Sequence, residues 1–179
     1  MARIIAGTAR SRPLRVPEGA RPTPDRVREA LFSSLEHRGY IEGCSVLDLC
    51  AGSGALAFEA LSRGAAAATA VDVSRAARSA LTANSRSLGL ELNIVTGKAL
   101  TFLAQDVSRY DLIFLDPPYA MGEDELTELL NLAADRLVDD GLIVVERDKR
   151  SPEPTWPPGI TGNDRRFGDT VLWSARRAE

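Results

Sequence analysis

Asp48-Leu49-Cys50-Ala51-Gly52-Ser53-Gly54 joins a short apolar strand, residues 45–49, to a helix that begins near Ala55. Glycines at a strand-to-helix turn let the backbone approach a ligand, and the helix N-terminus offers unpaired N–H groups. A dinucleotide site would need Gly-x-Gly-x-x-Gly here, with a third glycine. Asp48 repels phosphate but accepts hydrogen bonds from an ammonium group. The turn therefore favours the charged tail of an amino acid over a dinucleotide.

Apolar strands alternate with helices after this turn. Strands are expected at 45–49, 67–71, 91–95, 112–115 and 142–146, and helices at 55–63, 74–88, 99–103 and 123–137. Continuous apolar strands separated by helices are typical of a parallel sheet covered on both faces. Two last runs, 160–167 and 170–175, predict a closing hairpin. We expect a Rossmann-like α/β fold whose seven-stranded, mostly parallel sheet has an antiparallel final strand and helices on both faces.

The first forty residues have a different character. Runs at 3–7 and 12–16 predict a small β-hairpin extension, and four nearby prolines exclude a helix there. A helix then opens with Thr23 or Asp25 as its cap and ends near Arg38, and Ser74 caps a later helix. Residues 1–40 carry a net charge of +4 and the remainder −7. This asymmetry indicates either an anionic partner or a solvated arm.

Composition is that of one globular domain: 179 residues, 44% hydrophobic and 26% charged, with a net charge of −3. Cys44 and Cys50 are too few for a disulfide framework, and no apolar run approaches the roughly 20 residues that span a bilayer. The N-terminus is too poor in apolar residues for a signal peptide. We expect a reduced, soluble, cytoplasmic protein, monomeric by default, with the two cysteines in packing roles and His37 on the surface.

Asp72 and Val73 follow the second predicted strand. An acid at this strand end is well placed to bind the two hydroxyls of a ribose. Asp48, the glycine turn and Asp72 together suggest S-adenosylmethionine as the cofactor. The alternative is an ordinary tight turn followed by a helix cap.

Asp116-Pro117-Pro118-Tyr119, directly after the strand at 112–115, is the most specific signal in the chain. Two prolines stiffen the loop and leave carbonyls that no local N–H can reach. The Asp116 carboxylate and the Pro117 carbonyl can each accept one hydrogen of a planar NH₂ group, so charge developing on that nitrogen meets acceptors already in place. Tyr119 offers a ring on which a base can stack. The alternative is a stiff loop with Tyr119 in a packing role.

In this order and spacing, these motifs resemble the class I S-adenosylmethionine-dependent methyltransferases, and Asp-Pro-Pro-Tyr resembles the branch that methylates exocyclic amines of bases. More narrowly, Ile4-Ile5-Ala6-Gly7, Arg21-Pro22-Thr23-Pro24-Asp25-Arg26-Val27-Arg28-Glu29-Ala30-Leu31-Phe32 and the glycine turn resemble the RsmD family, which methylates N2 of a guanine in 16S ribosomal RNA. The resemblance runs over nearly the whole chain. It implies an RNA-contacting arm at 1–22 and a methyltransferase domain at 23–179.

The resemblance also implies residue roles. Cofactor contacts are expected at Asp48, Ala51, Gly52, Ser53, Gly54, Asp72, Val73, Lys98, Ala99 and Asp116; catalytic contacts at Asp116, Pro117, Pro118 and Tyr119; and RNA contacts at Arg3, Arg10, Arg12, Arg15, Arg26 and Arg28. Two positions depart from the family pattern. Cys50 stands where Phe or Gly is more usual, and Lys98 stands where Asp or Asn often binds the adenine amine. Since an ammonium group cannot accept that hydrogen bond, backbone groups are the remaining candidates.

The implied reaction is in-line methyl transfer from S-adenosylmethionine to guanine N2 in 16S rRNA of the small ribosomal subunit, without a metal. An adenine-N6 nucleic-acid methyltransferase would use the same loop chemistry, although its usual target-recognition domain is not seen here. A non-catalytic RNA-binding assembly factor with a vestigial methyltransferase fold would not need the intact acidic and proline motifs. A small-molecule methyltransferase would not need the arginine-rich arm.

Overall fold

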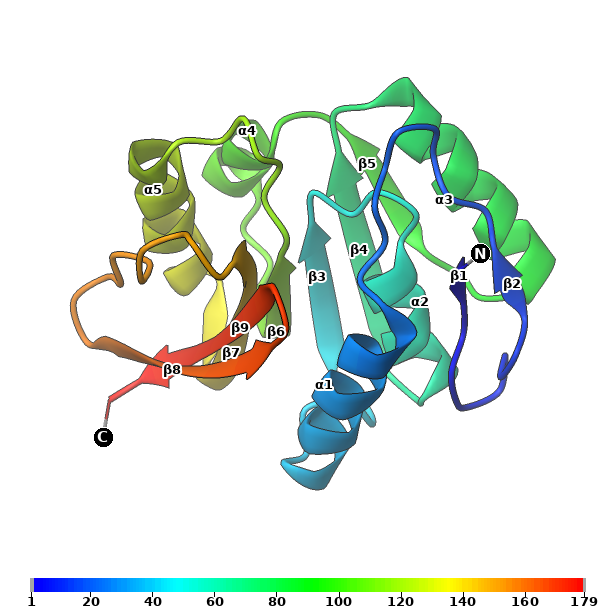
Figure 1. Cartoon of the computed structure of the whole chain (residues 1–179), viewed down its shortest axis with the longest axis horizontal. Helices are drawn as coiled ribbons and strands as arrows, with labels where there is room; N and C mark the ends of the chain where they lie inside the picture. The colour runs from blue at the N-terminus through cyan, green and yellow to red at the C-terminus, as the bar shows by residue number, and fades with distance from the viewer. Residues whose placement is uncertain (1, 179) are drawn as a thin grey trace.

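The computed structural model describes residues 2–178 and is built on a seven-stranded sheet with the strand order β5-β4-β3-β6-β7-β9-β8 (Figure 1). The strands are β3 (Ser45–Leu49), β4 (Ala67–Asp72), β5 (Asn93–Thr96), β6 (Tyr110–Leu115), β7 (Leu137–Asp148), β8 (Ile160–Phe167) and β9 (Thr170–Arg177). β3 to β7 are parallel to one another, and β9 is antiparallel to both of its neighbours. This arrangement confirms the predicted α/β fold with its antiparallel final strand.

Helices cover both faces of this sheet, as predicted (Figure 1). α1 (Asp25–His37), α2 (Ala55–Ser62) and α3 (Arg75–Leu88) pack on one face, and α4 (Ala99–Gln105) and α5 (Glu123–Ala134) pack on the other. Because successive strand residues point to opposite faces, Leu112 and Phe114 join the first core while Ile113 joins the second. Within residues 2–178, no helix is both long and apolar enough to cross a membrane.

The N-terminal arm, residues 2–16, forms the expected hairpin, but β1 (Ala2–Arg3) and β2 (Pro13–Leu14) are shorter than the predicted runs. The reason is that the backbone between them bonds to side chains of α2. Ile5 and Ala6 donate their N–H groups to the Glu59 carboxylate at 2.8 and 3.1 Å, and Ala9 donates to the Ser62 hydroxyl at 2.9 Å. With Ile4 fully buried, the arm is part of the main core.

Of the predicted helix caps, that of α3 is confirmed and that of α1 is wrong. The Ser74 cap of α3 is confirmed, since its hydroxyl accepts a hydrogen bond from the Ala77 N–H at 3.2 Å. The prediction for α1 is wrong: Pro24 occupies the N-cap position and makes no side-chain cap hydrogen bond. Thr23 is instead used in tertiary structure, because its hydroxyl donates to the Glu146 carboxylate at 2.6 Å.

The observed ends of α5 and β5 differ from the predicted ends. α5 stops at Ala134 rather than 137, because Leu137 already begins β7 and pairs with Tyr110 across an irregular register. β5 begins at Asn93 rather than 91. The outer limits of the two predicted domains, residues 1 and 179, lie outside the described residues, and the division of the chain at residue 22 stays a prediction.

Glu59 is the centre of a buried polar network. Its carboxylate is fully buried and faces Arg63 Nε at 2.8 Å and Arg28 Nη1 at 3.4 Å, in addition to the two N–H groups of the arm. Arg28 is also fully buried; it pairs with Asp25 at 2.5 Å and donates to the backbone carbonyl of Thr23 at 3.1 Å. A buried charge is tolerated when its partners satisfy it in this way.

Replacing Glu59 tests this network. Glu59→Ala removes one acceptor from each of two buried arginines and the acceptor of two arm N–H groups, so the free energy of unfolding should fall by about 3–5 kcal/mol. Urea denaturation followed by circular dichroism measures the change. Glu128→Ala, which removes an exposed glutamate from α5, is the matched control and should alter it by less than about 0.5 kcal/mol. Equal stabilities of the two variants would contradict the assigned role.

Candidate active site

The site lies at the carboxyl edge of the sheet, where the strand order reverses. From β3 the chain moves outward to β4 and β5 and then returns to β6 on the other side of β3. Ligands of open α/β sheets bind at such a switch point. Parallel register brings the ends of β3 and β6 together, with Leu49 beside Leu115. Asp48 and Asp116 therefore flank the crevice from adjacent strands.

The glycine turn holds a conformation that other residues adopt only with strain. Gly54 has φ +79°, and a Cβ at this position would lie 2.6 Å from Leu81 Cδ2 and 2.7 Å from Phe58 Cε2. Cys50, a non-glycine residue, has φ +60°, and strain of this kind concentrates at functional sites. The Gly52 N–H donates to Asp72 Oδ2 at 2.9 Å, so the last residue of β4 fixes the shape of the turn.

Asp48 is a buried acid with few partners. It is 1% exposed and accepts one backbone hydrogen bond, from the Ala57 N–H at 3.2 Å. Burial raises its pKa well above the usual range, and the charge of Asp72 raises it further. A carboxyl group of this kind fits a ligand ammonium group, which would stabilise its ionised form.

The second acid, Asp72, links three segments. Its other oxygen accepts the Ser74 N–H at 2.9 Å, and its backbone carbonyl accepts the Gly97 N–H at 3.0 Å. The loop before α4 is thereby held beside the end of β4. Val73, 64% exposed, offers an apolar surface at the same strand end, which fits the flat face of a base.

Lys98 and Ala99 begin α4, with Lys98 at the N-cap position. The exposed Lys98 lines a hollow of about 310 Å³ together with Thr96 and Phe102. The Lys98 ammonium group has only donors, so this side chain cannot accept a hydrogen bond from a base amine. Recognition of an adenine amine by backbone groups stays a prediction.

The Asp-Pro-Pro-Tyr loop begins at the end of β6. Pro117 is buried, and its carbonyl receives no hydrogen bond from residues 2–178, whereas the Pro118 carbonyl accepts the Met121 N–H at 3.0 Å. Burial raises the pKa of Asp116 well above its usual range; Glu146 and Asp48 raise it further, while Arg147 lowers it. Tyr119 is 83% exposed, so its ring is open to stacking rather than packed. Two unused acceptors thus stand next to a free aromatic ring.

Glu146, at the carboxyl end of β7, is the residue that the sequence prediction missed. Leu115 pairs with Val145, so Asp116 and Glu146 follow side by side. Burial raises the pKa of Glu146, and the hydrogen bond from Thr23 lowers it. The rule that selected Asp48, Asp72 and Asp116, an acid at the end of a parallel strand, applies equally to Glu146.

The cysteines and metal-ligating groups show no further site. Burial raises the pKa of the Cys50 thiol to about 12, with nearby carboxylates raising it further, so the thiol stays protonated at neutral pH. Cys44 and Cys50 are both free thiols. Within the part of the chain that the structure describes, no three histidine, cysteine or acidic side chains are grouped so that they could hold a metal ion.

The predicted RNA-contacting arginines differ in their burial and in their ion pairs. The prediction for Arg28 is wrong, because its guanidinium is fully buried between Asp25 and Glu59. Arg3 is exposed but pairs with Asp25 at 3.1 Å. Arg10, Arg12, Arg15 and Arg26 are exposed, with Arg12 donating to a backbone carbonyl of α3.

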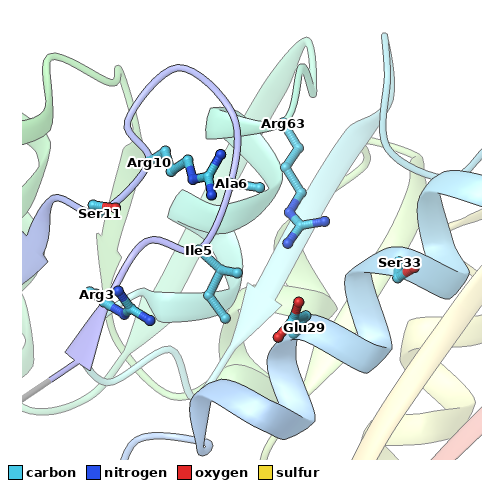
Figure 2. Close-up of a pocket in the computed structure, with 8 residues that line it drawn as sticks. All are labelled: Arg3, Ile5, Ala6, Arg10, Ser11, Glu29, Ser33 and Arg63. Atoms are coloured by element: carbon cyan, nitrogen blue, oxygen red, sulfur yellow. The ribbon is translucent and has the colours of Figure 1, made fainter.

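Figure 2 shows a hollow of about 410 Å³ between the N-terminal arm and helices α1 and α2. Arg3, Arg10 and Arg63 line it, together with the acid Glu29. Arg63 is nearly buried and pairs with Glu59 and Glu36. Arg10 is exposed and is therefore the arginine of this hollow that has no acidic partner among residues 2–178.

Comparison with known proteins identifies the family. A family profile described as "Conserved hypothetical protein 95" matches residues 2–176. Ribosomal RNA small subunit methyltransferase D of Escherichia coli K12 is 43% identical over 160 residues, which cover 87% of this chain and 79% of that protein. The chain belongs to this family. The predicted resemblance to the RsmD family is thereby confirmed.

Other relatives agree. Ribosomal RNA small subunit methyltransferase D of Haemophilus influenzae is 38% identical over 157 residues, 84% of this chain and 80% of that protein. The solved structure of the hypothetical protein TTHA0928 of Thermus thermophilus superposes with a TM-score of 0.85 at 34% identity, covering 99% of this chain and all of that one. The fold is that of the class I S-adenosylmethionine-dependent methyltransferases.

The buried state of Asp48 predicts a pH-dependent stability. Because its pKa is raised on folding, the folded protein binds more protons than the unfolded chain between the unfolded pKa, about 4, and the raised value, so stability falls as pH rises through this window. In Asp48→Asn this loss is absent, so the stability of the variant relative to the parent should increase with pH. Urea denaturation between pH 4 and 8 measures it. Asp140→Asn, at an exposed position, is the control; parallel curves for Asp48→Asn and the parent would contradict the prediction.

Proposed function

We propose that this protein transfers the methyl group of S-adenosylmethionine to the exocyclic N2 of a guanine in 16S ribosomal RNA of the small subunit. The observation that carries the proposal is the paired set of acceptors, the Asp116 carboxylate and the free Pro117 carbonyl, beside the strained glycine turn. The relatives named ribosomal RNA small subunit methyltransferase D support the RNA as substrate.

The residues of the glycine turn fit the cofactor. In this proposal Asp48 faces the ammonium group, Ala51 to Gly54 wrap the methionine tail, and Asp72 binds the ribose. Val73, Lys98 and Ala99 border the adenine. Bound there, S-adenosylmethionine supplies an electrophilic methyl group on a sulfonium centre.

Asp116 and Pro117 prepare the nucleophile. Each accepts one N2 hydrogen, which directs the nitrogen lone pair toward the methyl group and stabilises the positive charge that develops on N2. The raised pKa of Asp116 makes its carboxylate a better acceptor for the proton that N2 releases after the C–N bond has formed. Tyr119 stacks on the base after it leaves its own stack.

The exposed arginines of the N-terminal side supply phosphate contacts. Arg10, Arg12 and Arg15 belong to the N-terminal arm and Arg26 to α1, and all four are exposed. Contacts of this kind are salt-dependent and carry no sequence information. The protein is proposed to act as a cytoplasmic monomer on RNA within the small ribosomal subunit.

Asp116→Ala tests the catalytic assignment. Removing one preorganised acceptor should lower methyl transfer to hypomethylated small subunits by at least about 100-fold. Cofactor affinity, measured by calorimetry, should stay within about threefold, because Asp48, the glycine turn and Asp72 are proposed to make most of the cofactor contacts and Asp116 only one of them. Nucleoside digestion of the parent's product should yield N2-methylguanosine. N6-methyladenosine, or equal loss of binding and transfer in the variant, would overturn the assignment.

Arg10→Ala tests the arm. Loss of one phosphate contact should weaken RNA binding and reduce the slope of log affinity against log salt concentration by about 0.7–1. Filter binding of 16S RNA at several salt concentrations gives the slope. Arg176→Ala, an exposed arginine on β9 at the far side of the sheet, is the matched control (Figure 1). Identical slopes for the two variants would exclude Arg10 from the RNA contact.

A further inference from the structure

Glu146 lies in the region where the target base has to enter. Phe114 pairs with Val144, and both side chains pack into the core under α1. Glu146 stands two residues further along β7 and therefore faces the α1 side of the sheet, and Asp116, which directly follows β6, is close enough for the charge of Glu146 to raise its pKa. The group at the end of β7 is thus a direct neighbour of the proposed amine acceptor.

The structure itself uses only half of the Glu146 carboxylate. Oε2 accepts the Thr23 hydroxyl at 2.6 Å. Within residues 2–178, Oε1 receives no hydrogen bond, and no arginine or lysine forms an ion pair with Glu146. Burying a carboxylate without a cation or a full set of donors costs stability. Glu146 is half-buried in the structure, so a base that covers it would bury this oxygen, and an N–H group of the base could then supply the missing partner.

Guanine and adenine differ at the atom next to the amine. Beside the N2 amine, guanine carries N1–H, a hydrogen-bond donor; beside the N6 amine, adenine carries N1 without a hydrogen, an acceptor. We propose that the free oxygen of Glu146 accepts the N1–H of the guanine whose N2 is held by Asp116 and Pro117, and that Glu146 thereby selects guanine over adenine. This inference rests on the function proposed above.

Thr23 orients the Glu146 carboxylate. Its hydroxyl occupies Oε2, which leaves Oε1 for the base, and its donated hydrogen bond opposes the rise that burial causes in the pKa of Glu146. An adenine in the same pose would place its N1 lone pair against that charge. A site built to accept a substrate hydrogen rejects an analogue that lacks it, because the buried acceptor is left without a partner.

2-Aminopurine tests the proposed contact to N1–H, since it keeps the 2-amino group of guanine but has no hydrogen on N1. Once the target position is mapped, small subunits are reconstituted with guanine or 2-aminopurine at that position, and kcat/KM is measured for both. The parent should prefer guanine by roughly 100-fold or more. Glu146→Gln, which keeps an acceptor for Thr23 and adds an amide donor for N1, should reduce that preference at least about tenfold.

Two variants complete the experiment. Thr23→Val should reduce the preference by a smaller factor, because it removes the group that orients Glu146. Asp140→Asn removes a charge from the opposite end of β7 and should leave the preference unchanged. The absence of O6 from 2-aminopurine affects all variants alike, so the change in the ratio is the informative quantity.

The outcomes distinguish the two proposals. If Glu146→Gln lowers kcat/KM equally for both bases, Glu146 does not read N1 and this inference is overturned while the proposed function stands. If the parent forms no N2-methylguanosine, the proposed function itself fails and the proposed role of Glu146 fails with it. A circular dichroism melt of each variant establishes that it is folded.

Discussion

The contact between the Glu59 carboxylate and the Arg28 guanidinium, 3.4 Å apart and without solvent exposure, is the interaction on which the N-terminal part of the molecule depends. Glu59 holds the arm by two backbone N–H groups, and Arg28 holds the segment before α1 through the Thr23 carbonyl. Thr23 in turn donates to Glu146 at the carboxyl edge of the sheet. One chain of buried polar contacts therefore runs from α2 to the end of β7.

This chain explains why a short arm with two-residue strands is ordered. Such a hairpin is too small to be stable by itself, and its main support comes from side chains of the helices beneath it. Breaking one buried charge pair costs several kcal/mol, which is comparable with a large part of the stability of a domain. The arm, the segment around Thr23 and the carboxyl end of β7 are thus held in fixed relation by these contacts.

The sequence was sufficient for the architecture and for three of the four edge acids. Continuous apolar runs predict parallel strands, and an acid that closes such a run must lie at the carboxyl edge, which located Asp48, Asp72 and Asp116. The sequence was insufficient where a side chain has two possible partners. Thr23 satisfies a local capping rule, but its partner, Glu146, lies 123 positions away. Local rules carry no information on contacts of that range.

Arg28 shows the same limit for charge. Counting arginines in residues 1–40 treats each as a surface charge, yet Arg28 is neutralised by Asp25 and Glu59 in the interior, and Arg3 shares Asp25. Net charge along a sequence measures attraction to an anion only after internal pairs are subtracted. The charge that remains belongs to fewer exposed groups such as Arg10, while the paired Arg28 and Arg63 join α1, α2 and the arm. Arg28 of the family-specific arginine segment therefore serves the fold.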